Sequence, residues 1–260
     1  MFKGNYGFFD YKYNIIGYNG QDYGSLAQYL YLIISIILLV FLLIVLRKLP
    51  KNKILNIIRF VSIFLILFYI GKTTWESIYD IKLNGKFNTG LLPFDTCSII
   101  MLAGLLAGFA KGKIKKTAEC WIATGSIIGG VGTMLYLNAF KYYPFLSFGA
   151  FYSMIWHFLM VFLGLLLIVT NYVEINFNTV KKGFIFHFLI SIFVIPIDFI
   201  FDFDFMLYKN LGGIPIFEDF GSILISKGLG FINPIMMLVL YFLAFSLIIS
   251  IPMLIKKLRK

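Results

Sequence analysis

Cys97 and His157 are the two side chains whose types can carry covalent chemistry together. A thiol becomes a nucleophile when a base takes its proton or a nearby cation lowers its pKa, and an imidazole can do either. The reaction class that such a pair supports is acyl transfer through a thioester. The alternative for Cys97 is structural, because a free cysteine often packs in an interior as a small hydrophobic residue.

Helical spacing places both side chains on faces that pack against protein. Cys97 precedes Met101 and Gly104 by four and seven residues, and His157 follows Ser153 by four, which are the intervals of one helical stripe. With a rise of about 1.5 Å per residue, they lie about 9 and about 10 Å below the outer ends of their predicted helices. The sequence therefore predicts equal depth in the outer half of a membrane and leaves their contact open.

Asp95 and Asp198 lie at the same predicted depth, and each is a candidate to orient the histidine. Ionisable groups within membrane spans are costly and are therefore candidates for function. Asp95 has a second, favoured interpretation: two residues from Cys97 it points to another helix face, where its carboxylate would cap the helix start. Asp198 shares a stripe with His187 and Ser191, and His187 is expected too near the inner side to join the site.

The elements that must position these residues are transmembrane helices. Of 260 residues 60% are hydrophobic and 13% charged, against about 25% charged in soluble domains. The apolar residues form runs of about 20, the length of one membrane crossing. We predict an all-α bundle of about seven helices in one domain, 26–255, with spans at 26–46, 54–71, 91–110, 118–137, 150–170, 183–201 and 231–255.

The positions of the basic residues predict the topology. If the N-terminus lies outside, fourteen Lys and Arg side chains fall in short inner segments and eight in the outer ones. Cytoplasmic loops retain Lys and Arg, so this split favours an outer N-terminus and an inner C-terminus. The net charge of +11 then reflects topology and contact with membrane lipids rather than a nucleic-acid partner. The expected location is the cell membrane, with multiple passes.

The remaining segments have simpler interpretations. Residues 1–25 are predicted to form an outer interfacial tail, residues 256–260 a basic cytoplasmic tail, and residues 202–230 a solvated loop whose acids fit no EF-hand pattern. The glycines of the third and fourth spans indicate close helix packing. No internal repeat is visible, which weakens a transporter interpretation.

No cofactor is expected from the sequence. It has no glycine-rich phosphate loop, and its two cysteines and two histidines are scattered in depth, which does not suit zinc. Cys120 is predicted at the inner end of the fourth span, where it is structural and too far from Cys97 for a disulfide.

Residues 92–97, Leu-Pro-Phe-Asp-Thr-Cys, followed sixty residues later by His157, resemble the YwaF family of bacterial integral membrane proteins. That family is related to a eukaryotic transmembrane Cys/His phospholipid acyltransferase. Its pattern is approximately Leu-Pro-Leu-His-Leu-Cys, with Ser-His-Gly two helices later. Leu92, Pro93, Cys97 and His157 match, whereas Asp95 replaces a histidine and Trp156 and Phe158 flank His157. A later family motif is met only loosely at residues 204–207. The resemblance implies Cys97 as acyl-carrying nucleophile and His157 as general base.

The leading hypothesis is a YwaF-type membrane protein, a lipid acyltransferase or acyl hydrolase using this Cys/His pair. Two alternatives stay open: a non-catalytic protein that binds or transports a small ligand, and a structural partner of a membrane complex. The substrate, the direction of transfer and the oligomeric state are not determined by the sequence.

Overall fold

The computed structural model describes residues 7–11, 19–20, 22–85, 87, 89–136, 139–211 and 215–258. Most of the predicted tail at 1–25, together with Lys86, Arg259 and Lys260, lies outside the described residues. Throughout the described part the regular elements are helices and no strand occurs, which confirms the all-α prediction.

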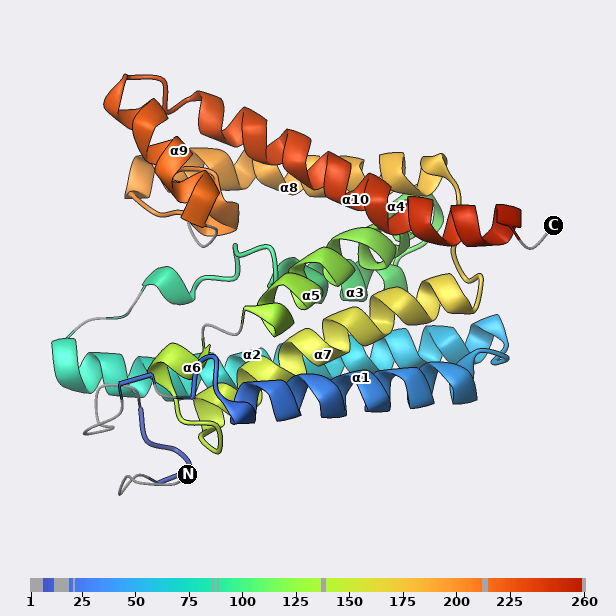
Figure 1. The fold of residues 1–260 in the computed structure, drawn as a ribbon, viewed down its shortest axis with the longest axis horizontal. Helices are drawn as coiled ribbons and strands as arrows, with labels where there is room; N and C mark the ends of the chain where they lie inside the picture. The colour runs from blue at the N-terminus through green and yellow to red at the C-terminus, as the bar shows by residue number, and fades with distance from the viewer. Residues whose placement is uncertain are drawn as a thin grey trace.

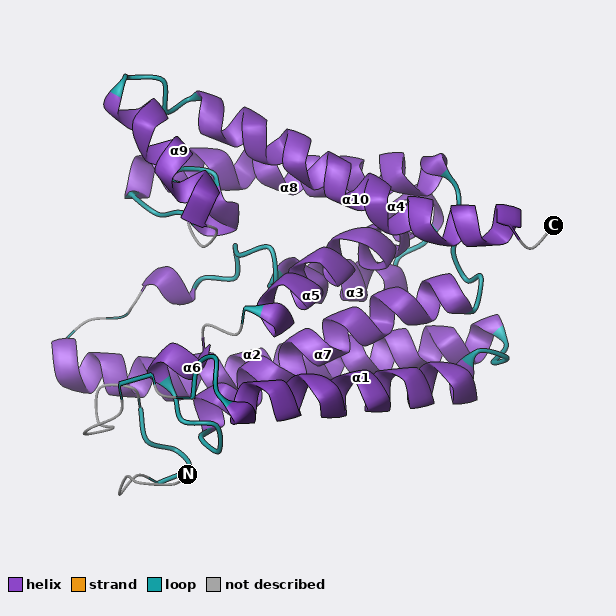
Figure 2. Cartoon of the chain, viewed as in Figure 1, coloured by secondary structure: helices purple, strands orange, loops and turns teal. Residues whose placement is uncertain are grey.

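The helices follow one another through the chain as shown in Figure 1 and, by type, in Figure 2. Their bounds are α1 Leu26–Leu46, α2 Lys51–Asn84, α3 Ile99–Phe109, α4 Gly112–Trp121, α5 Ile127–Leu135, α6 Ala139–Tyr142, α7 Phe148–Val169, α8 Phe177–Phe201, α9 Pro215–Ser226 and α10 Ile232–Leu258. Short 3-10 turns occur at η2 (Thr89–Leu91) and η4 (Phe205–Leu207), and a π-helical turn, η3 (Ile122–Ser126), joins α4 to α5.

Within the described residues six helical segments are long and apolar enough to cross a membrane: α1, α2, the segment containing α4 and α5, α7, α8 and α10. The predicted third span is shorter than expected. Its helix, α3, has 11 residues, or about 16 Å at the α-helical rise, roughly half of a hydrocarbon core. Successive segments, α3 included, alternate in direction, so the start of α1 and the end of α10 lie at opposite ends of the bundle (Figure 1). Which end faces outward stays a prediction.

Helix α2 is longer than the predicted span at 54–71. The charged residues from Lys72 onward argued for a helix end there, yet the helix continues to Asn84 and stops at Gly85, whose φ of 69° suits a glycine. The continuation is possible because its buried acids have partners: Glu76 pairs with Lys72, and Asp80 accepts a hydrogen bond from Tyr11.

The segment at 202–230 was predicted to be a solvated loop, and the structure corrects this. It contains η4 and α9, and Phe205, Met206, Tyr208 and Leu211 are buried. Tyr208 reaches α8, where its hydroxyl lies 3.2 Å from His187 Nε2. The aromatic and aliphatic side chains of this segment thus pack into the bundle, although its acids suggested exposure.

The glycine faces pack as predicted, with partners that the structure identifies. Helix α3 lies against α2 and α5 against α7. A Cβ at Gly104 would lie 2.2 Å from Ser62 Oγ of α2, and one at Gly130 would lie 2.6 Å from a methyl carbon of Val161 on α7. Only glycine therefore permits these helix separations.

We expect Gly104→Ala to lower the thermal unfolding temperature in detergent, because overpacking a close contact costs about 1–3 kcal/mol. Gly132→Ala on α5 is the matched control, since no atom lies within 4 Å of its added Cβ. Equal unfolding temperatures for the two variants would contradict the described α2–α3 packing.

Candidate active site

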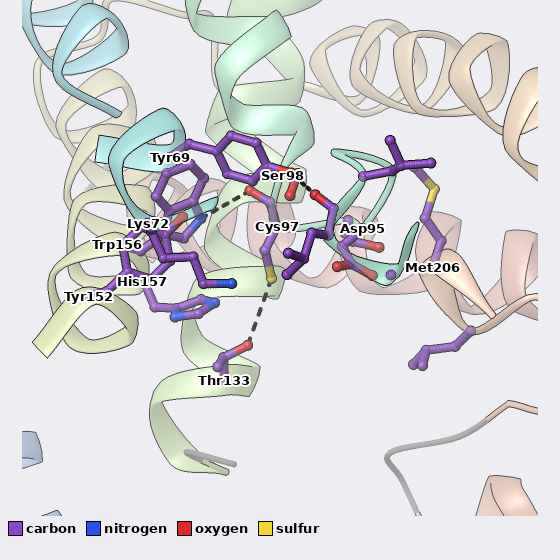
Figure 3. A pocket seen from close by; sticks show the side chains of 15 residues that line it. Tyr69, Lys72, Asp95, Cys97, Ser98, Thr133, Tyr152, Trp156, His157 and Met206 are labelled. Atoms are coloured by element: carbon purple, nitrogen blue, oxygen red, sulfur yellow. Dashed lines mark hydrogen bonds between the residues drawn. The ribbon is translucent and has the colours of Figure 1, made fainter. Parts of the chain in front are cut away.

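A pocket of about 410 Å³ opens beside Cys97 (Figure 3). Its walls come from five parts of the chain: α2, the connection at 89–98, α5, α7 and η4. The residues that line it are Tyr69, Lys72, Gly90, Leu91, Leu92, Asp95, Thr96, Cys97, Ser98, Thr133, Tyr152, Trp156, His157, Met206 and Leu207. The structure thus brings three of the four predicted site residues, Asp95, Cys97 and His157, to one cavity.

Cys97 lies in the turn before α3, not within the helix as its spacing suggested. Two helices hold this turn. The Trp156 indole Nε1–H donates to the Cys97 carbonyl at 3.2 Å, and the Thr96 hydroxyl is 2.6 Å from the Tyr241 hydroxyl of α10. The Cys97 sulfur is 3.8 Å from Thr133 Oγ1 on α5. The backbone of the thiol is therefore fixed while the sulfur faces the pocket.

Cys97 and Asp95 both belong to the connection at 89–98, outside the membrane-spanning helices. Burial raises the pKa of the Cys97 thiol to about 12, and the nearby charge of Asp95 adds to this effect. The thiol is therefore neutral near pH 7, and a base must remove its proton before it can attack.

His157, on α7, is oriented by its own helix. Its Nδ1 lies 2.7 Å from the Ser153 carbonyl oxygen, and a carbonyl can only accept, so Nδ1 carries the proton. In the neutral ring Nε2 then has the free lone pair. This is the tautomer a general base requires, and the orienting partner is a backbone carbonyl instead of the predicted carboxylate.

Asp95 lines the pocket on the other side of Cys97 from Lys72 (Figure 3). Its carboxylate is reached by solvent, yet the surrounding protein removes enough water to raise its pKa to about 6, against the opposing effect of Lys72. Ser98 takes the N-cap position of α3, and Asp95 offers its backbone carbonyl, which accepts from Ser98 N at 2.8 Å. In the described contacts its side chain does not act as the expected cap.

Asp198 does not line the pocket. It is fully buried on α8, and its Oδ1 accepts from the Phe205 backbone N–H at 2.9 Å. This bond holds η4, whose Met206 and Leu207 line the pocket with left-handed φ values of 54° and 62°. Such backbone persists only where surrounding contacts impose it. Asp198 therefore supports the pocket wall rather than His157.

His187 and Ser191 are also fully buried, as their shared stripe predicted. The Tyr208 hydroxyl bonds to Ser191 and lies 3.2 Å from His187 Nε2, and Trp121 Nε1–H donates to His187 Nδ1 at 3.4 Å. This polar cluster ties α8 to α4 and to the segment after η4. It lies outside the pocket lining, which agrees with the expectation that His187 does not join the site.

Pocket residues that were not predicted from the sequence include Lys72, Tyr69, Thr133, Trp156 and Met206. The sequence does indicate a partner for Lys72, because Glu76 follows it by four residues on the same helix face. This pair was not considered, since the predicted span ended at residue 71. The others are ordinary apolar or hydroxyl residues whose spacing carries no such signal. Among the described residues no group of three acids, cysteines or histidines is arranged to hold a metal ion.

We expect the labelling rate of Cys97 by a maleimide, measured in a Cys120→Ala background, to be low at pH 7 and to rise continuously beyond pH 9. The raised pKa keeps the thiolate fraction small until the pH approaches about 12. A labelling rate that levels off below pH 8 would contradict the raised pKa of the thiol. The Cys97→Ala variant controls for reaction at other groups.

The TMEM164 family, a transmembrane protein family, is the family whose model matches the chain, over residues 23–255. No curated protein and no solved structure shows a significant match.

Proposed function

The chain belongs to the TMEM164 family of multi-pass membrane proteins, and from that premise we propose that it is a lipid acyltransferase. In this proposal Cys97 carries the acyl group as a thioester and His157 is the general base. The observation that carries the proposal is the pocket itself, in which both side chains face one cavity (Figure 3). The resemblance of residues 92–97 to the YwaF family implies the same chemistry.

The arrangement supports acyl transfer in two steps. His157 Nε2 takes the Cys97 thiol proton as the sulfur attacks the ester carbonyl, and the carbonyl electron pair moves to oxygen. The tetrahedral intermediate then collapses, the bond to the ester oxygen breaks, and the leaving alcohol receives the proton from His157. A second lipid hydroxyl reverses these steps to take the acyl group. Water in its place would make the protein an acyl hydrolase.

The raised pKa of Cys97 opposes thiolate formation, so the mechanism depends on His157 taking the thiol proton during the attack. A thiolate formed in advance would be exposed to oxidation and alkylation, whereas a neutral thiol reacts only when His157 and an acyl donor are both in place. Membrane lipids are the acyl donors that fit, because the pocket lies among helices that are long and apolar enough to cross a membrane and has aromatic walls at Tyr69, Tyr152 and Trp156.

We expect the wild-type protein in phospholipid vesicles to form a hydroxylamine-sensitive acyl adduct on Cys97, detected by intact mass and peptide mapping. Cys97→Ala removes the adduct. His157→Gln lowers the rate of its formation about 10²- to 10⁴-fold, the usual contribution of a general base.

Cys120→Ala is the matched control and retains the wild-type rate, because Cys120 is buried in α4 outside the pocket lining. Absence of an adduct in the wild type, with lipid binding that survives Cys97→Ser, would reject acyl transfer and favour a ligand-binding protein.

A further inference from the structure

Lys72 is a charged side chain in the pocket that the two-step reaction leaves without a role. It lies on α2, and Figure 3 shows its amine directed toward Cys97 from the same side as the His157 imidazole. Among the fifteen lining residues it is the one lysine, and no arginine lines the pocket. A lysine within a membrane-spanning helix is costly, so its position facing the Cys97 thiol makes it a candidate for function.

Two contacts hold the Lys72 amine in place. Glu76, one turn further along α2, accepts from Lys72 Nζ at 2.5 Å, and the Tyr152 ring centroid lies 5.5 Å from the amine. Glu76 is only 5% exposed and also accepts from the Tyr143 hydroxyl at 3.3 Å. A buried carboxylate with this geometry compensates the charge of the lysine and fixes its direction.

The lysine retains hydrogen-bonding capacity, whereas neighbouring donors are already used. An ammonium group has three N–H donors, of which Glu76 takes one. In the described pocket Trp156 Nε1–H is committed to the Cys97 carbonyl, Thr133 Oγ1 to the Gly129 carbonyl and Tyr69 Oη to the Leu91 carbonyl. Lys72 is thus a charged donor that can meet a new negative charge beside Cys97 without giving up its partner.

We propose that Lys72 is a further catalytic residue, which donates to the oxyanion formed when the Cys97 sulfur attacks an acyl carbonyl, with Glu76 as its positioning residue. The inference rests on the proposed acyl transfer. As the C–S bond forms, the carbonyl electron pair moves to oxygen and a Lys72 N–H donates to it. When that pair returns and the ester C–O bond breaks, the Lys72 hydrogen bond weakens and its proton stays on nitrogen.

A lipid phosphate is the other anionic group that Lys72 could meet. The oxyanion is favoured because the amine is directed at the thiol, where the oxyanion forms (Figure 3). The two roles predict different kinetics, since an oxyanion forms with every acyl donor and a phosphate contact requires a phosphate.

The experiment compares two acyl donors, a glycerophospholipid and a phosphate-free p-nitrophenyl acyl ester, with purified full-length protein in detergent. Lys72→Met is expected to lower kcat for adduct formation about 10²- to 10³-fold with both donors, the usual effect of losing one oxyanion donor. Lys72→Arg should recover part of this loss. Lys82→Met, at an exposed position on the same helix, is the control and should match the wild type.

Lys72→Met leaves the buried Glu76 carboxylate without a positive partner and could destabilise the fold. The double variant Lys72→Met/Glu76→Gln removes both charges, so a loss of kcat in it reflects catalysis and not unfolding. It should unfold near the wild-type temperature and show the same loss of kcat. An unchanged kcat in an active, folded Lys72 variant overturns this inference alone, as does a KM increase confined to the phospholipid. Absence of any adduct in the wild type overturns both this inference and the proposed acyl transfer.

Discussion

The structure depends on hydrogen bonds to the backbone of an irregular connection, residues 89–98, which packs among membrane-spanning helices. Backbone carbonyl and N–H groups that are shielded from water need partners within the protein. Side chains of the neighbouring helices supply them: Tyr69 of α2 donates to the Leu91 carbonyl and Trp156 of α7 to the Cys97 carbonyl. These bonds let a non-helical segment persist where a continuous helix would otherwise be required.

The same helices that satisfy this connection also carry the groups of the proposed active site. Helix α2 provides both Tyr69 and Lys72, and α7 provides both Trp156 and His157. Fixing the connection therefore also fixes the relative positions of thiol, imidazole and ammonium groups. In the proposed acyl transfer, preorganisation of this kind lowers the cost of aligning the reacting groups.

Features that depend on consecutive residues could be predicted from the sequence, whereas features that depend on partners distant in the chain could not. The inward faces of His157 and of His187 and Ser191 were predictable, because a helical stripe is a property of consecutive residues. The length of α2 and the packing of Phe205 and Tyr208 were not, since each depends on partners distant in the chain: Tyr11 for Asp80, and His187 for Tyr208. A charged residue ends an apolar run in sequence, but a buried partner lets the helix continue.

The sequence by itself determined an all-helical membrane protein and its approximate spans, because hydropathy and periodicity are local quantities. The matched depth of the cysteine and the histidine stays a prediction. Only the tertiary structure decided that Cys97 lies in a turn instead of a helix, that the Ser153 carbonyl and not a carboxylate orients His157, that Asp198 supports η4, and that Lys72 faces the thiol. These outcomes depend on which helices become neighbours, and that is settled by packing of the whole bundle.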